Sequence, residues 1–339
     1  MKSRIFLSVV FLLFFTLLVM PFESNGHGVE IYSAQMSDEN PMVRRAAAEQ
    51  LVRVGKDHVD TVLPLLIKAL KDEDKYVRFY ATMALGKIGE SAVDAIPALV
   101  EALKDEDVTV RSRVTELLGQ LGKNREQDVV PGLIAALKDE NPMVRSKVAT
   151  ALGRLDGSTG EVVPALMGAL KDEDKGVRRR TAEALGRIGE PAEVVVPVLI
   201  EALQDKDKGV RRYAAAALGR IGKPAAQAAV LALTQVLTDE DKGVALAAAA
   251  ALGRIGEPVE EAISMLIDAL KAEAPYIREE AIIALGGVAT SAQGIVPMLV
   301  AALDDKNKGV RYRALEALSE IDTPEAIKAV EEFKKNNNE

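Results

Sequence analysis

The stretch KDEDKGVRRRTAEALGRIGEP, residues 171–191, decides the fold because close copies of it recur along the chain. Aligned on Arg178, its counterparts stand at Arg44, Arg78, Arg111, Arg145, Arg211, Ala245, Arg278 and Arg311, spaced by 33 or 34 residues. Self-similarity at such a period is the signature of a repeat architecture. The sequence therefore predicts nine repeats between residues 27 and 322, of which the first is clipped.

Each repeat contains the signals of two helices. In eight of the nine repeats an Asn or Asp stands four residues before the position of Arg178, where its side chain would cap a second helix. Apolar residues then recur at helical spacing, as at Val177, Ala184 and Leu185, and Gly189 ends the helix. The first helix carries patterns such as VVPVLIEAL, residues 195–203, with proline expected in its first turn.

A single hairpin of this length buries too little apolar surface to offset the entropy lost when it becomes ordered. Stacking on neighbouring hairpins supplies the missing burial. The predicted fold class is therefore all-α, an α-solenoid of about nine helical hairpins. The aromatic content of 4% and the many alanines suit helices that approach one another closely.

The motif D-x-x-x-x-V-R followed by A-x-x-A-L-G-x-I-G resembles the HEAT repeat, in the short bacterial form also met in phycobilisome bilin lyase-like proteins. The same period occurs in ankyrin and tetratricopeptide repeats, but the T-P-L-H turn of the former and the large aromatics of the latter are missing. The resemblance covers about Val29 to Asp322. It implies a scaffold or binding surface, with the second helices on the concave face.

The resemblance also implies a ladder of Asp and Arg side chains between repeats. Its members would be Asp72, Arg78, Asp105, Arg111, Asp139, Arg145, Asp172, Arg178, Asp205 and Arg211. Repeat 7 has Ala245 at the arginine position, and repeat 8 has Ala272 at the aspartate position. The two losses meet at one junction if each Arg pairs with the Asp of the following repeat.

Composition argues against several other functions. The net charge of -8 disfavours nucleic acid and anionic membrane surfaces as partners, and the absence of cysteine removes disulfides and thiolate sites. A phosphate-binding loop is disfavoured because acidic residues precede each second helix, and the spacing of a calcium-binding loop is absent. His27 and His58 have no neighbour at metal-ligand spacing. We expect no catalytic residues, no metal and no cofactor.

The N-terminus predicts export. Lys2 and Arg4 precede the apolar run from Ile5 to Met20, and Pro21 follows it. Residues 1–26 are thus a signal peptide or an N-terminal membrane anchor, and both readings place the remaining chain outside the cytoplasm, secreted, periplasmic or membrane-anchored. At the other end, residues 323–339 are expected to form a capping helix with Ile327, Val330 and Phe333 on its packed side, followed by a frayed tail.

The predicted partner-binding residues are those that depart from the repeat on the outward and flanking positions of the second helices. They are Tyr76, Phe79, Tyr80, Met83, Arg113, Lys147, Arg179, Arg180, Arg212, Tyr213, Tyr276 and Tyr312. Aromatics are frequent interface anchors, although they can also fill gaps between small residues. The arginines predict a basic middle stretch, whereas Glu279 and Glu280 make repeat 8 acidic.

These features predict a monomeric, non-catalytic scaffold that binds an extended protein segment on its concave face. The favoured segment would have an acidic middle and an apolar patch near repeat 2. The alternative hypothesis is a bilin lyase-like or other ligand-chaperone role.

Overall fold

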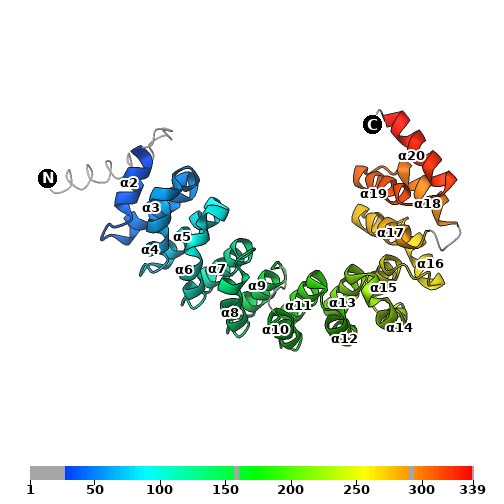
Figure 1. Ribbon diagram of the computed structural model, residues 1–339, viewed down its shortest axis with the longest axis horizontal. Coiled ribbons are helices and arrows are strands. Elements are labelled where there is room, and N and C mark those ends of the chain that lie inside the picture. The colour runs from blue at the N-terminus through cyan, green and yellow to red at the C-terminus, as the bar shows by residue number, and fades with distance from the viewer. Residues whose placement is uncertain (1–26, 156–159, 290–293, 338–339) are drawn as a thin grey trace, which may run out of the picture. The chain divides into compact units, whose positions relative to one another are not determined.

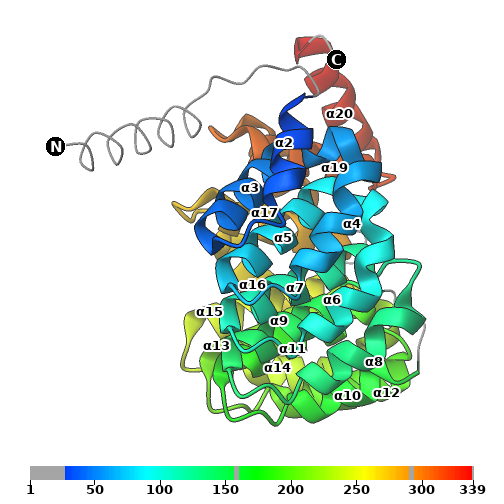
Figure 2. The ribbon, with the colours of Figure 1, turned by 90° about the vertical axis from the view of Figure 1, so that its left-hand side faces the viewer.

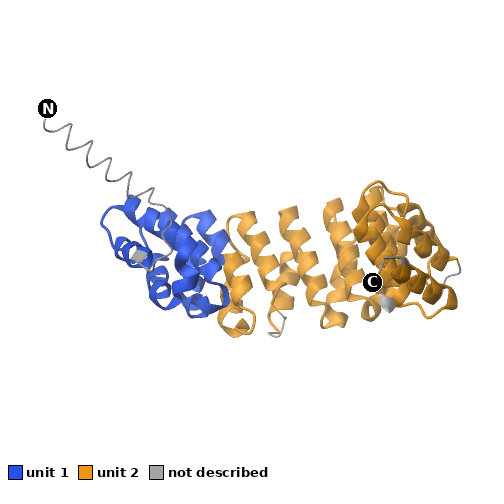
Figure 3. Cartoon of the chain, turned by 90° about the horizontal axis from the view of Figure 1, so that it is seen from above, with its two compact units in different colours: residues 1–114 blue, residues 115–339 orange. Residues whose placement is uncertain are grey.

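A computed structural model describes residues 27–155, 160–289 and 294–337. Within these ranges the chain is helical and has no strand, as the repeat pattern predicted. It divides into two compact units, with the boundary between Val114 and Thr115 (Figure 3). The predicted export segment lies outside the described residues. None of the helices described is long and apolar enough to cross a membrane.

First and second helices alternate along the sequence. The first helices are α2 (His27–Gln35), α4 (Val59–Ala69), α6 (Ile96–Ala102), α8 (Glu126–Ala136), α10 (Val162–Ala169), α12 (Ala192–Ala202), α14 (Ala226–Val236), α16 (Glu260–Ala269) and α18 (Ile295–Ala301). The second helices are α3 (Pro41–Val54), α5 (Lys75–Ile88), α7 (Val108–Leu121), α9 (Pro142–Leu152), α11 (Lys175–Ile188), α13 (Lys208–Ile221), α15 (Lys242–Ile255), α17 (Pro275–Val288) and α19 (Lys308–Ser319). Helix α20 (Pro324–Asn337) follows the last pair, and short 3-10 turns η1 (Gly55–His58), η2 (Gly89–Ala95), η3 (Lys223–Ala225) and η4 (Ala302–Asp304) join several helices.

The second unit is built from two layers. Its second helices α9, α11, α13, α15, α17 and α19 pack side by side in sequence order. The first helices α8, α10 and α12 lie on one side of that layer, and the second helices line the inner side of the unit's arc (Figures 1 and 2). One face of each second helix is therefore free of other helices.

The second helices begin where the sequence placed their caps. Asp174 Oδ1 accepts hydrogen bonds from the backbone N–H groups of Gly176, at 2.8 Å, and Val177, at 3.1 Å. The equivalent side chain accepts from at least one N–H group of the first turn at Asn40, Asp74, Asp107, Asn141, Asp207, Asp241 and Asn307. The predicted glycine stop is confirmed at Gly189, which ends α11 with φ of 68°, a conformation that glycine adopts without strain.

Apolar side chains from both helices of a hairpin make the core. Val177 and Leu185 on α11 are fully buried, as are Leu166 on α10 and Leu199 on α12. Each such side chain contributes roughly 1.5–3 kcal/mol relative to an exposed one. The core thus extends from hairpin to hairpin through the unit instead of closing within one hairpin.

Successive second helices of the second unit meet along a seam of glycine and alanine. A Cβ built on Gly186 of α11 would lie 2.3 Å from Ala217 Cβ of α13, so any larger residue would force the helices apart. The seam repeats as Gly119–Ala151, Gly153–Ala184, Gly186–Ala217, Gly219–Ala251, Gly253–Ala284 and Gly286–Ala317. Its effect is to hold neighbouring second helices at close range.

Two details differ from the sequence-based expectations. Pro64, Pro131 and Pro197 lie inside their first helices instead of in the first turn, because the turn before each proline is helical as well. Burial of the valines in that turn offsets the hydrogen bond that proline cannot donate. In α20, Ile327 is 46% exposed, and the smaller Ala326 makes the buried contact with the array instead.

Candidate functional site

Arginines and aspartates connect consecutive hairpins at one edge of the array. Arg78 Nε donates to Asp105 Oδ2 at 2.6 Å, and Arg78 Nη2 donates to Asp105 Oδ1 at 2.9 Å. The third nitrogen, Nη1, donates to the backbone carbonyls of Asp72 and Glu73 in the arginine's own hairpin. Only 6% of Arg78 is exposed, so this bidentate pair is largely removed from water.

The same pairing joins other consecutive hairpins within each unit. The pairs are Arg44–Asp72, Arg145–Asp172, Arg178–Asp205, Arg211–Asp239 and Arg278–Asp305. Arg111 is buried and donates to the carbonyls of Asp105 and Glu106. Hydrogen bonds from the arginines lower the pKa of Asp239 and of Asp305 below the ordinary range. The series is interrupted where Ala245 and Ala272 occupy the two ladder positions.

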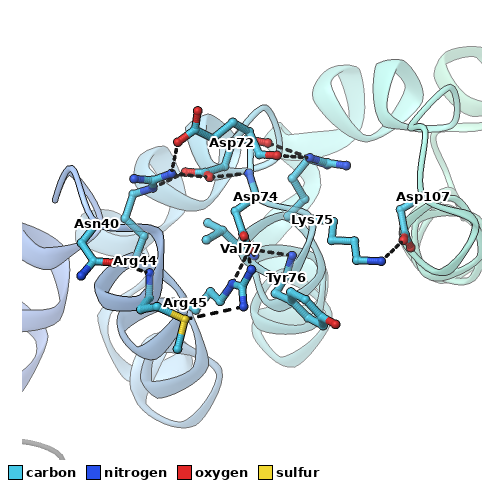
Figure 4. A network of polar contacts seen from close by, with 12 residues as sticks. Asn40, Arg44, Arg45, Asp72, Asp74, Lys75, Tyr76, Val77 and Asp107 are labelled. Carbon is cyan, nitrogen blue, oxygen red and sulfur yellow. Dashed lines mark hydrogen bonds and ion pairs between the residues drawn. The ribbon is translucent and has the colours of Figure 1, made fainter.

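A second set of ion pairs, which the sequence reading missed, crosses between hairpins at the helix caps. Arg45 donates to Asp74, which also caps α5, and Lys75 Nζ lies 3.0 Å from Asp107 Oδ2 (Figure 4). In the second unit Arg179 binds Asp207 at 2.7 and 2.9 Å. The hydrogen bond from Arg179, aided by the backbone N–H groups of α13, lowers the pKa of Asp207 to about 2.

The signal for this second set was present in the sequence. Each pair joins a capping aspartate to a basic residue that stands either one position after, or three positions before, the ladder arginine of the preceding repeat. Lys208 and Asp241, 2.8 Å apart, follow the same rule. The capping aspartates thus serve two structural roles.

Several residues predicted to bind a partner are engaged within the chain. Arg179 pairs with Asp207, Lys147 pairs with Glu116 of α7, and Arg180 donates to Glu183 of its own helix at 2.8 Å. Arg113 is half-buried. Arg212 is exposed and lies 5.5 Å from the centre of the Tyr213 ring, with no ion pair among the described residues.

Three aromatic side chains of the first unit lie on α5. Tyr76 is 47% exposed, with the guanidinium of Arg45 at 4.3 Å and Lys75 Nζ at 5.5 Å from its ring centre (Figure 4). Phe79 and Tyr80 are half-buried and meet edge to face at 5.7 Å. Met83, one turn further along the helix, is half-buried as well. Together they form an aromatic surface bordered by cations.

Three tyrosines of the second unit lie on three different helices. Tyr276 on α17 is 72% exposed and Tyr312 on α19 is 60% exposed, while Tyr213 on α13 is half-buried. The guanidinium of Arg313 lies 5.9 Å from the Tyr312 ring centre. None of these three side chains belongs to the buried core.

Small open grooves lie between first helices. One of about 510 Å³ in the second unit is lined by residues of α10 and α12, among them Met167, Gly168 and Val198. The described part of the chain contains no group of three or more acidic or histidine side chains arranged to hold a metal ion.

Comparison with known proteins identifies the repeat. A family model described as HEAT repeats matches residues 30–119, 96–161, 130–196, 163–234, 196–286 and 263–339. No curated protein matches the chain. Among solved structures, a crystal structure of an engineered protein from the Northeast Structural Genomics Consortium is similar at 23% identity and a TM-score of 0.52, covering 90% of this chain and 92% of that one. The complex of CpcE and CpcF of phycocyanin lyase from Nostoc sp. PCC7120 contains a chain with 24% identity and a TM-score of 0.53, covering 71% of this chain and 94% of that one.

Proposed function

The chain belongs to the HEAT-repeat family, and on that basis we propose that it is a non-catalytic scaffold that binds an extended protein segment along the free face of its second helices. HEAT proteins generally mediate protein interactions, and this array presents an uninterrupted layer of second helices in its second unit. A solenoid stacks its repeats in a line, so a partner is bound on the elongated surface. We propose that the chain acts as a monomer with a protein partner.

The observation that carries this proposal is the exposure of tyrosines on second helices. Tyr76, Tyr276 and Tyr312 present large apolar rings to solvent, although the core of the array is built almost entirely from small and aliphatic side chains. Tyrosine contributes a rigid contact area with a polar tip, which is why it is enriched among interface anchors. Since these rings contribute little to the core, a role in contacting a partner accounts for their placement.

The test is affinity purification with the chain as bait. Replacing Tyr76, Tyr276 and Tyr312 together by Ala removes three anchors without opening the core, so captured proteins should be lost while the unfolding temperature changes little. Leu231→Ala is the matched control, because Leu231 is 71% exposed on first helix α14. An unchanged set of captured proteins for the triple variant, or an equal loss with Leu231→Ala, would contradict the proposal.

A second candidate is a ligand-chaperone role of the bilin lyase-like kind. The observation in its favour is the similarity to a chain in the phycocyanin lyase complex, which at 24% identity supports a common fold. A chaperone for a pigment would retain it through purification or change its absorption on mixing. We favour the scaffold because the grooves described between helices are open and measure a few hundred Å³.

We also propose that the array acts outside the cytoplasm, delivered by residues 1–26. Two basic residues followed by an apolar run support this proposal. Mass determination of the chain recovered from each cell fraction tests it. A cytoplasmic chain that retains all of its N-terminal residues would contradict it.

A further inference from the structure

A row of arginines follows the free face of the second unit. Nine residues after each ladder position stand Arg154, Arg187, Arg220 and Arg254, in four consecutive repeats. We call these four residues the arginine row. Arg154 lies just beyond the end of α9, and the others lie in the last turns of α11, α13 and α15. Nine residues correspond to a half-turn from the buried ladder arginine, and Arg154, Arg187 and Arg220 are exposed there.

The arginine row is only partly neutralised within the chain. Arg154 and Arg220 are exposed and have no ion pair in the part of the chain that the structure describes. Arg187 Nη2 lies 3.4 Å from Glu183, which Arg180 already holds at 2.8 Å, and Arg254 lies 2.8 Å from Glu280. The surface therefore keeps a surplus of positive charge in a chain whose net charge is -8.

The glycine–alanine seam sets the spacing of the row. Helices in contact through small residues lie at the near end of the usual interaxial range of roughly 8–10 Å. We therefore expect equivalent side chains on successive second helices to be separated by about this interaxial distance. An extended chain of polyproline II type brings every third residue to the same side, at about 9.3 Å per three residues. One ligand residue in three thus advances by nearly the spacing of the arginine row.

We propose that the arginine row binds an acidic protein segment in extended conformation, with a carboxylate at every third residue, running across α11, α13 and α15. This inference rests on the proposed scaffold function and specifies the chemistry of its partner. Arg212 and Tyr213 on α13 flank the row and add a cation and an aromatic ring to the same surface. Arginine forks bind carboxylates through paired hydrogen bonds, so both the charge and the geometry of the ligand matter.

Arginine near a helix C-terminus also stabilises the helix by interacting with its dipole. This role and the binding role predict different experimental results. A dipole role alone would make each arginine contribute to stability and leave binding unaffected. A binding role makes the row act together on one ligand, with an affinity that depends on ligand charge and spacing. The test therefore measures binding of a defined peptide together with the unfolding temperature.

The probe is a fluorescent peptide of five Glu-Pro-Pro triplets, followed by anisotropy in low salt with the full chain. We expect it to bind the wild type and to bind Arg187→Gln/Arg220→Gln about tenfold or more weakly, as lost charge pairs at an interface should produce. Lys175→Gln/Lys242→Gln is the matched control, since both lysines are exposed at the start of second helices and lie off the row. That variant should bind within about twofold of the wild type. A peptide of the same composition with its five glutamates contiguous should bind more weakly than the regular one.

Equal binding by the wild type and by Arg187→Gln/Arg220→Gln would overturn the proposal. Equal affinity for the regular and the contiguous peptide, or tighter binding of single-stranded DNA, would also overturn it and mark the row as a general polyanion surface. The triple tyrosine variant separates this inference from the scaffold function. If that variant binds the peptide normally and loses its captured proteins, then the row and the tyrosines serve different contacts. If Arg187→Gln/Arg220→Gln keeps all captured proteins, the scaffold function is retained and the proposed binding of an acidic segment is refuted.

Discussion

Two junctions of the second unit join neighbouring repeats by different means. Between repeats 5 and 6, Arg178 pairs with Asp205 and Arg179 pairs with Asp207, so two ion pairs cross the junction. Between repeats 7 and 8 the ladder positions hold Ala245 and Ala272, and Ala274 precedes α17 without a side-chain cap. An ion pair between Arg254 and Glu280, at 2.8 Å, crosses there instead. Hairpins thus stack with or without the ladder.

The feature that both junctions share is the glycine–alanine seam. Gly186 meets Ala217 at the first junction, and Gly253 meets Ala284 at the second. On α15, Ala245 is itself buried, and so are Ala248 and Ala249 one turn further along the helix. Replacing both members of a buried ion pair by apolar residues is often nearly neutral, whereas removing one member leaves an uncompensated charge. At the junction of repeats 7 and 8 the arginine and the aspartate are both absent, because Ala245 and Ala272 stand in their places. The joint absence agrees with this asymmetry.

The largest predicted effect is that of breaking one ladder pair at the junction of repeats 5 and 6. Arg178 is 5% exposed, so Arg178→Ala leaves Asp205 without its partner in a poorly hydrated place. We expect a loss of about 3–5 kcal/mol in the free energy of unfolding. Urea denaturation of the variant, followed by circular dichroism, measures it.

The double variant Arg178→Ala/Asp205→Ala is the control, because it imitates the junction of repeats 7 and 8. Its loss should be smaller than the sum of the two single losses by 1 kcal/mol or more, as expected for groups in direct contact. Additive losses would show that the pair is not coupled, and the comparison of the two junctions would then fail.

A smaller effect is expected from the seam, which both junctions share. Gly186→Ala places a methyl group 2.3 Å from Ala217 Cβ and 2.5 Å from its Cα, so the backbones must separate. Overpacking of this kind costs about 1–3 kcal/mol. Gly168→Ala is the matched control, because nothing lies within 4 Å of a Cβ at that position, and it should stabilise α10 by roughly 0.5–1 kcal/mol. A stabilising Gly186→Ala would refute the close approach of α11 and α13.

Much of the fold could be read from the sequence because its signals are local. The caps at Asp174 and its equivalents, the glycine stop at Gly189 and the apolar spacing between them each report on a few consecutive residues. Their recurrence at a period of 33 or 34 residues then fixes the stacked architecture. The prediction for Ile327 was wrong because α20 occurs once, so its sequence cannot be compared with equivalent helices in other repeats. A single apolar stripe does not settle which side of the helix is packed.

The functional surface could be predicted less well, because exposure and charge neutralisation depend on side chains from neighbouring repeats. Arg179 and Arg212 occupy the same register position and look alike in sequence. In the structure Arg179 is held by Asp207, while Arg212 extends beside Tyr213, because Lys208 already pairs with Asp241. The difference between them arises because Lys208 and Arg212 compete for the carboxylate of Asp241. The outcome of this competition depends on the geometry of the junction, which the sequence does not give.

The ion pairs also make the first junction sensitive to acid. Asp207 has its pKa lowered to about 2 by Arg179, against about 3.9 in an unfolded chain. Its contribution, about 2 kcal/mol, is therefore fully present above about pH 4 and is lost as the pH falls toward 2. The difference in unfolding free energy between the wild type and Asp207→Asn, measured in urea at pH 7, 5, 4 and 3, should shrink below pH 4. A difference that is constant over this range would contradict the assigned pair. The junction of repeats 7 and 8 has Ala274 at the equivalent position and no such carboxylate.

The smallest predicted effect is a gain at the second junction. Ala274 has the extended backbone of a helix cap, with φ of -73° and ψ of 120°, close to that of Asp174 at the start of α11. Ala274→Asp should accept hydrogen bonds from the first N–H groups of α17 and raise the unfolding free energy by about 1 kcal/mol. Asn307→Ala makes the opposite change at α19, where Asn307 Oδ1 accepts from Gly309 N–H at 2.8 Å, and should lower stability by a similar amount. If Ala274→Asp gains nothing while Asn307→Ala loses stability, then α17 begins with its amides already satisfied, and the two junctions differ in more than their side chains.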